Sequence, residues 1–101
     1  MNDDIVYVDE DLKSIVPKFL ESQKSELTKI KAAVQNLDFG ELTRLGHKMR
    51  GSCGGYGFDK LGKFGAEIEL AAMAKDKNAA GDVLKKIEDH FLNMKIEFKK
   101  T

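Results

Sequence analysis

The chain has 101 residues, of which 42% are apolar, so residues 1–101 are expected to form one domain with its own core. Seventeen basic residues balance seventeen acidic ones, which argues against a nucleic-acid-binding protein, and no apolar run approaches the roughly 20 residues of a membrane-spanning helix. The single cysteine excludes an internal disulfide, and the whole composition indicates a reduced protein of the cytosol.

The first third of the chain predicts two helices separated by a proline. Asp9 is a good N-cap residue followed by acids, so a short helix is expected from residue 9 to about residue 16. Pro17 has no N–H to donate inside that helix, but it is tolerated at the first position of a new one. A long helix is therefore expected from Pro17, and its apolar face consists of Phe19, Leu20, Leu27, Ile30, Val34 and Leu37.

The rest of the chain predicts three more helices. Asp38, with Glu41 three residues later, resembles a capping box and begins a helix that runs to the glycines at 54, 55 and 57. Asp59 is expected to cap the next helix and Asn78 the last one. The inner faces of these two helices are expected to carry Leu61, Phe64, Ile68 and Ala72, and then Leu84, Ile87, Phe91, Met94 and Phe98. Short connections make neighbours antiparallel, so the predicted fold is all-α: an up-down antiparallel four-helix bundle with a short extra N-terminal helix.

The helix that begins near Asp38 places one histidine opposite its core face. At about 100° per residue, His47 lies almost diametrically across from a narrow apolar stripe. That stripe consists of Leu42, Leu45, Met49, Cys53 and Tyr56. We therefore expect His47 to face solvent and Cys53 to be a small buried hydrophobe, too far round the helix to act with His47.

Glycines lie on the same outer face as His47. Gly40, Gly51 and Gly54 fall on this side, and each glycine inside a helix costs roughly 0.5–1 kcal/mol relative to alanine. Glycines on an exposed face do not improve the packing of the core, so this cost is not offset there. We therefore expect these glycines to keep His47 accessible. Gly51, one turn after His47, would leave room for a large group.

Cations also lie near His47. Arg50 and Arg44 are three residues away on either side and Lys48 is adjacent, so an anion formed on the imidazole would be stabilised. An isolated surface histidine is more simply a solvated residue without a role. That interpretation is kept for His90, which has no such neighbours.

The stretch HKMRGSCGGYG, residues 47–57, resembles the signature of histidine-containing phosphotransfer (HPt) domains of bacterial two-component signalling. That family has a histidine, two residues, then Lys, Gly and Ser or Ala, within the second long helix of a four-helix bundle. Here His47, Gly51 and Ser52 match, and Arg50 stands where lysine is usual. The resemblance extends to VDEDLKSIVPKFLESQ before the motif, FDKLGKFGAEIELAAM after it, and the final amphipathic helix.

The resemblance implies a phosphocarrier without kinase activity of its own. His47 would accept a phosphoryl group from a receiver-domain aspartate or a histidine kinase and pass it to another receiver aspartate. The direction of this transfer between His47 and a receiver could also be reversed. Arg50 would screen the phosphoryl charge, and Gly51 would leave steric access. Glu69 falls where the family often has a Gln or Glu that orients the imidazole.

The implied partners are the receiver domain of a response regulator and a hybrid histidine kinase. No cofactor or metal is implied, and we expect a cytoplasmic monomer. Met1 and the compact length favour a free-standing protein.

Three other functions stay open on the sequence alone. A dimerisation and phosphoacceptor domain of a histidine kinase typically has an acid after its histidine, whereas Lys48 follows here, and its bundle forms from two chains. A passive helical adaptor would dock a partner with His47 playing no part. A hydrolase using His47 as a base lacks a second catalytic group at a suitable spacing.

Overall fold

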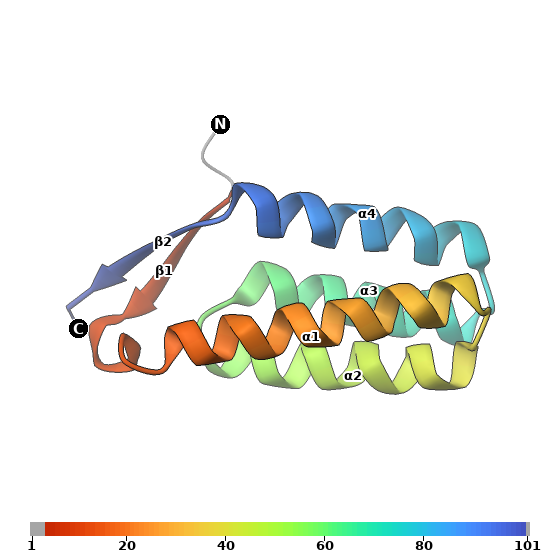
Figure 1. The fold of residues 1–101 in the computed structure, drawn as a ribbon, viewed down its shortest axis with the longest axis horizontal. Coiled ribbons are helices and arrows are strands. Elements are labelled where there is room, and N and C mark those ends of the chain that lie inside the picture. Colours follow the sequence, from red (N-terminus) through yellow and green to blue (C-terminus); the bar gives the residue numbers. More distant parts are fainter. Residues whose placement is uncertain (1–3, 101) are drawn as a thin grey trace.

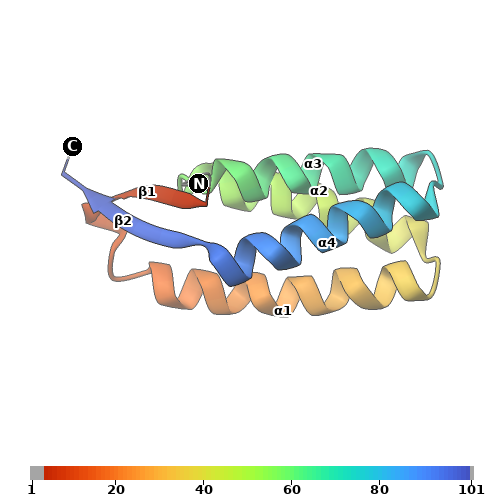
Figure 2. The same ribbon diagram turned by 90° about the horizontal axis from the view of Figure 1, so that it is seen from above.

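Four α-helices make up most of residues 4–100, the part of the chain that this computed structural model describes. They are α1 (Val16–Gln35), α2 (Phe39–Gly55), α3 (Asp59–Met73) and α4 (Lys77–Asn93), and each runs in the opposite direction to the helix before it (Figure 1). Seen from above, α4 lies between α1 and α3 (Figure 2). The prediction of four long helices is confirmed.

The core consists mainly of the apolar faces that helical periodicity predicted. Leu37 is an exception, because α1 ends at Gln35 and Leu37 is 47% exposed in a left-handed conformation (φ 54°). Every residue expected on the inner face of α3 is buried, and so are the α2 residues Leu42, Leu45, Met49 and Cys53. Burial raises the pKa of the Cys53 thiol to about 12, so this cysteine is a neutral packing residue, as predicted.

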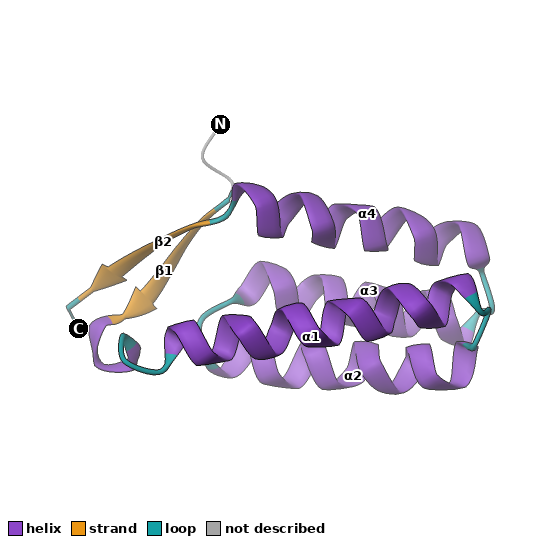
Figure 3. Cartoon of the chain, viewed as in Figure 1, coloured by secondary structure: helices purple, strands orange, loops and turns teal. Residues whose placement is uncertain are grey.

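Segments near the two ends of the chain form a parallel two-stranded sheet, which was not predicted from the sequence. β1 (Ile5–Asp9) and β2 (Lys95–Lys99) pair along their whole length at one end of the helices (Figure 3). Assignment to the all-α class is therefore wrong at the chain ends. Val6 and Val8 are buried whereas Tyr7 between them is exposed, which is the alternation of a strand.

The expected short N-terminal helix is also corrected. A three-residue 3-10 helix, Glu10–Leu12, stands in place of a helix over residues 9–16. Asp9 caps it as predicted, its carboxylate accepting the Asp11 N–H at 2.9 Å. α1 then begins at Val16 with Pro17 as its second residue, where the missing N–H costs no helical hydrogen bond.

α4 begins and ends elsewhere than predicted. Asp76, rather than Asn78, is its N-cap, and the Asp76 carboxylate accepts the Ala79 N–H at 3.0 Å. Lys75, just before this cap, has a left-handed conformation (φ 55°) and separates α4 from α3. At the other end, Met94 is extended (φ −63°, ψ 132°) and leads into β2. Met94 and Phe98 therefore lie outside the helix to which they were assigned.

The start of α2 follows the prediction, whereas the start of α3 does not. Asp38 caps α2 by accepting the Glu41 N–H at 3.2 Å. Asp59 is the first residue of α3 and not its cap, and Phe58 occupies the N-cap position without a side-chain hydrogen bond. Phe58 is buried with its ring centroid 4.9 Å from that of Phe19, so packing sets this helix end.

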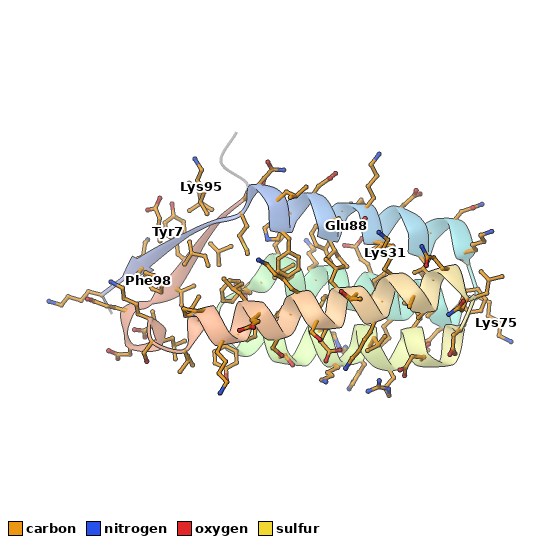
Figure 4. All side chains as sticks on the ribbon, viewed as in Figure 1. Tyr7, Lys31, Lys75, Glu88, Lys95 and Phe98 are labelled. Carbon is orange, nitrogen blue, oxygen red and sulfur yellow. The ribbon has the colours of Figure 1, made fainter. Side chains whose placement is uncertain are left out.

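Lysines cover the aromatic side chains of the sheet. The Lys99 ammonium lies 4.3 Å from the centroid of the Tyr7 ring, and the Lys13 ammonium lies 5.5 Å from that of Phe98. Figure 4 shows Tyr7 and Phe98 on the two strands. These cation–π contacts partly cover aromatic surface at the edge of a small sheet, where an uncovered apolar edge would promote association.

A buried histidine ties the sheet to the helices. His90 on α4 is 3% exposed, so its interpretation as a solvated residue is wrong. Its Nδ1–H donates to Asp4 Oδ1 at 2.8 Å, since a carboxylate only accepts, and Lys60 Nζ on α3 lies 3.4 Å from the same oxygen. The Asp4 carbonyl also accepts the Lys95 N–H at 2.9 Å. Asp4 thus links α3, α4 and β2 at the point where β1 begins.

The pH dependence of stability tests this link. The hydrogen bond from His90 and the charge of Lys60 hold the pKa of Asp4 below its ordinary value. A lowered folded-state pKa means that the stabilisation is present above the unfolded-state pKa and is lost as the pH falls through the folded-state pKa. We expect Asp4→Ala to lower the melting temperature by a few degrees at pH 7, and the difference from wild type to shrink below about pH 4.

Circular dichroism melts from pH 7 to pH 2.5 measure this difference. Asp82→Asn, which removes the charge of an exposed carboxylate on α4, is the matched control and should change the melting temperature little. An Asp4→Ala variant as stable as wild type at pH 7 would contradict the link.

Candidate functional site

His47 projects from the middle of α2 on the side away from the core. Its side chain is 64% exposed, whereas the opposite side of α2 buries Leu42, Leu45, Met49 and Cys53, so the predicted orientation is confirmed. Tyr56, also assigned to that stripe, follows the last residue of α2 and is half-buried. The helical path from the Asp38 cap therefore places an accessible imidazole on a rigid element. A nucleophile held in this way keeps its position without a loop that has to close.

Two charged side chains reach the same nitrogen of the His47 ring. Nδ1 is 3.0 Å from Glu69 Oε2 on α3 and 2.9 Å from Arg50 Nη2, one turn further along α2. Arg50 Nε also lies 3.6 Å from Glu69 Oε1. The three side chains form one cluster, in which Nε2 is the ring nitrogen turned away from Glu69 and Arg50.

The contacts at Nδ1 compete for one proton position. Glu69 only accepts, so its hydrogen bond needs a proton on Nδ1 and leaves the lone pair on Nε2. Arg50 only donates, so its hydrogen bond to Nδ1 needs the other tautomer. The geometry accommodates both forms, and the one paired with Glu69 presents Nε2 as a nucleophile.

Glu69 reaches His47 because the backbones of α2 and α3 touch. A Cβ placed on Gly46 would lie 2.7 Å from both the Glu69 nitrogen and the Gly65 carbonyl oxygen. A Cβ on Gly65 would lie 2.6 Å from the Arg50 nitrogen. Any larger residue at either position would clash with main-chain atoms, so glycine permits this approach.

Gly46 and Gly65 were not predicted as site-forming residues from the sequence, although the pattern of glycines on α2 and α3 contains a signal for them. Gly62 and Gly65 lie on the same side of α3 as its buried residues, and Gly46 borders the apolar stripe of α2. Glycines that fall on the inner faces of two neighbouring helices indicate close backbone packing.

The outer-face glycines leave the surface beside His47 bare. Apart from its two chain neighbours and the adjacent backbone of α2, a Cβ at Gly51, Gly54 or Gly55 would meet no atom of the described residues within 4 Å. At Gly40 it would meet only Asp38 Oδ1, at 3.9 Å. A molecule approaching His47 along α2 therefore meets helix backbone rather than side chains.

Two of the cations expected near His47 are engaged elsewhere. Lys48 Nζ donates to Glu26 Oε1 on α1 at 2.8 Å, and Arg44 bonds both carboxylate oxygens of Glu41, at 2.6 and 2.9 Å. Burial raises the pKa of Glu26, but Lys48 and a nearby lysine outweigh it and hold that pKa below its ordinary value. Arg50 is the cation that the structure brings to His47.

No metal-ligand group is found in the part of the chain that the structure describes. Within residues 4–100, no three His, Cys, Asp or Glu side chains are clustered as ligands.

None of the helices described has the length and apolar character needed to cross a bilayer. The chemistry available at His47 is that of an imidazole, a carboxylate and a guanidinium.

The contact between α2 and α3 is tested by adding single methyl groups. Gly46→Ala and Gly65→Ala should each lower the free energy of unfolding by about 1–3 kcal/mol, because a Cβ there overlaps backbone that cannot shift alone. Gly51→Ala is the control, since it adds the same group in open space and should stabilise α2 by up to about 1 kcal/mol.

Urea denaturation of the three variants followed by circular dichroism gives these free energies. If Gly46→Ala or Gly65→Ala were as stable as Gly51→Ala, the two helices could not be in backbone contact at that position.

Comparison with known proteins gives one result. The model of the Hpt domain family matches residues 14–96, which include all four helices and every residue of the His47 cluster. No curated protein sequence and no solved structure matches the chain.

Proposed function

The chain belongs to the Hpt domain family, and on that basis we propose that it carries a phosphoryl group on His47 between receiver-domain aspartates of a phosphorelay. The observation that carries the proposal is the His47 ring itself, exposed on α2 with its Nδ1 held 3.0 Å from Glu69. Hpt domains are phosphocarriers rather than kinases, so neither a nucleotide nor a metal of its own is needed. We further propose that the protein acts as a cytoplasmic monomer.

The transfer step assigns a role to each ring nitrogen. The Nε2 lone pair attacks the phosphorus of the receiver's aspartyl phosphate, a P–N bond forms, and the aspartyl P–O bond breaks with its electron pair left on the receiver's carboxylate. The proton on Nδ1 stays on the ring, so the product is a phosphorylated imidazolium. Glu69 accepts the hydrogen bond from Nδ1 and stabilises that positive charge. Transfer to the next receiver reverses the same bonds.

Arg50 supplies the nearest positive charge for the phosphoryl oxygens. Phosphoryl transfer needs in-line positioning and neutralisation of charge rather than covalent help, and a guanidinium offers a forked set of donors. Its Nη2 lies 2.9 Å from Nδ1 of the same ring, so the guanidinium is already beside the imidazole that would carry the phosphoryl group. Lys48 and Arg44 would first have to leave Glu26 and Glu41, so they contribute less.

Phosphorylation of wild type and His47→Gln tests the proposed function. Mixed with a receiver domain that carries ³²P on its aspartate, wild type should acquire acid-labile, base-stable label, whereas His47→Gln should acquire none. Because His47 lies outside the core, the variant should keep the stability of wild type to within roughly 0.5 kcal/mol.

The circular dichroism spectrum of the variant is the control for folding. Label on His47→Gln would disprove the assignment of the phosphoacceptor. No label on wild type from any receiver of the same cell would favour the alternative function, a passive helical adaptor in which His47 is not phosphorylated.

Substitutions of Arg50 and Arg44 on α2 distinguish a specific effect of the Arg50 charge on transfer from a general effect of positive charge near His47. Arg50→Ala should slow single-turnover transfer by up to about tenfold, because removal of a cation near the transferring group costs of the order of 1 kcal/mol at a site partly open to water. Arg50→Lys should stay close to wild type, and Arg50→Glu should be slower than Arg50→Ala.

Arg44→Ala is the matched control, since it removes the same charge from a residue paired with Glu41 one turn before His47. Its transfer rate should stay within about twofold of wild type. Equal rates for Arg50→Ala and wild type at both low and high salt would show that Arg50 takes no part.

A further inference from the structure

Arg50 and Glu69 oppose each other at one atom of the His47 ring. Arg50 Nη2 lies 2.9 Å from Nδ1 and Glu69 Oε2 lies 3.0 Å from it, although a neutral imidazole carries only one ring proton. A proton on Nδ1 satisfies Glu69 and leaves the nucleophilic lone pair on Nε2. A proton on Nε2 satisfies Arg50 and removes that lone pair. Each charged side chain therefore favours a different tautomer.

Arg50 also weakens the hold of Glu69 on the ring. Its Nε lies 3.6 Å from Glu69 Oε1 while its Nη2 lies beside the ring, so one guanidinium contacts both partners. A cation at that distance reduces the negative potential that the carboxylate exerts on Nδ1. The guanidinium is a planar fork with several donors, which lets it make the two contacts together. Both contacts shift the proton toward Nε2.

Arg50 is the member of this pair that is able to leave the ring. Its side chain is 51% exposed, whereas that of Glu69 is 18% exposed. Gly51 follows Arg50 on α2, and Gly54 lies one turn beyond it. Among the described residues, a Cβ on either glycine would meet nothing within 4 Å beyond its chain neighbours and the adjacent backbone of α2. Arg50 thus has open surface into which it can turn, while Glu69 stays in place.

We propose that Arg50 holds part of the His47 rings in the unreactive tautomer while the protein is alone, and that an arriving phosphoryl group releases the ring. This inference rests on the proposed function. A guanidinium bonds charged phosphoryl oxygens more strongly than a neutral ring nitrogen, so Arg50 turns from Nδ1 to the donor's phosphoryl group. Nε2 then gives its proton to water and Nδ1 takes one from water, with no net change in protons. Glu69 accepts the new Nδ1–H, and the Nε2 lone pair attacks phosphorus.

The two roles of Arg50 have opposite effects on transfer. Without Arg50 more of the rings are in the reactive tautomer, which by itself would raise the rate in proportion to their fraction. The phosphoryl charge is then less well neutralised, which lowers the rate. The neighbouring cations do not replace Arg50, because Lys48 is held by Glu26 on α1 and Arg44 by Glu41 on α2. Arg50 is therefore a positioning residue for the ring proton before it meets the phosphoryl group.

NMR of ¹⁵N-labelled protein at about pH 9, where histidine rings are ordinarily neutral, measures the tautomer ratio of His47. Ring nitrogens with and without a proton have well-separated ¹⁵N shifts. Wild type should show a mixture, and Arg50→Met, which keeps bulk but has no donor, should raise the ratio of Nδ1–H to Nε2–H about fivefold or more. Glu69→Ala should lower this ratio. His90, whose Nδ1–H is donated to Asp4, is the reference in the same spectrum.

Arg44→Met is the matched control, because it removes the same charge from α2 about one turn before His47 and should leave the ratio unchanged. A ratio that Arg50→Met does not change would overturn the proposal, and so would an equal change in Arg44→Met. A wild-type His47 ring with its proton entirely on Nδ1 would overturn it as well. Circular dichroism confirms that each variant is folded.

The release of the ring is measured in wild type saturated with a receiver domain from the same cell, selected as the fastest in transfer. Its aspartate carries beryllium trifluoride, a stable mimic of the phosphoryl group. The His47 ratio should move toward Nδ1–H at least as far as in Arg50→Met, and a ratio unchanged from the protein alone would overturn the release. If no receiver labelled wild type, the proposed function would fail, whereas the variants would still decide whether Arg50 sets the tautomer.

Discussion

The backbone contact between α2 and α3 is the constraint on which the site depends. Two helices with ordinary side chains between them lie 8–10 Å apart, which would hold Glu69 further from the imidazole. Glycine at positions 46 and 65 removes the intervening Cβ atoms and lets main-chain atoms meet. The same approach aligns Arg50 with Glu69, so one packing feature assembles the whole cluster. Two methylene groups of Glu69 then suffice to reach His47 Nδ1.

The contact between α1 and α2 contains polar groups that bear on the site indirectly. Gln23 is buried and its Oε1 lies 3.5 Å from the Cys53 sulfur, and Glu26 bonds Lys48. A buried carboxylate is stable in that place because two lysines compensate its charge. The consequence for function is that Lys48, adjacent to His47 in sequence, is turned toward α1. Neighbours along a helix point about 100° apart, so adjacency in sequence places them on different faces.

The chain ends are organised around a separate set of interactions. Gly57, between α2 and α3, has a positive φ of 87°, and a Cβ there would come within 3.3 Å of the Tyr7 carbonyl oxygen. β1 thus passes directly over the loop that follows α2, while Asp4 bonds His90 at its other end. The sheet fixes the end of the bundle without contributing a side chain to the His47 cluster.

Much of this protein follows from local sequence. The 3.6-residue periodicity determined the four helices, their buried faces and the outward direction of His47, because each depends on residues within a few turns. The motif around His47 indicated the family, and Asp38 marked the start of α2. These features need no information about distant parts of the chain.

Tertiary structure decided the rest. The sheet joins residues about 90 apart, so the choice between strand and helix for residues 5–9 and 95–99 depended on partners that no local window contains. His90 is buried and hydrogen-bonds Asp4, again a contact between opposite ends of the chain. At the site, helical spacing alone placed three cations near His47, and the resemblance to the family favoured Arg50. In the structure Lys48 pairs with Glu26, Arg44 with Glu41 and Arg50 with Glu69. Which carboxylate a flexible basic side chain meets is a property of packed helices, and it left Arg50 as the cation beside His47.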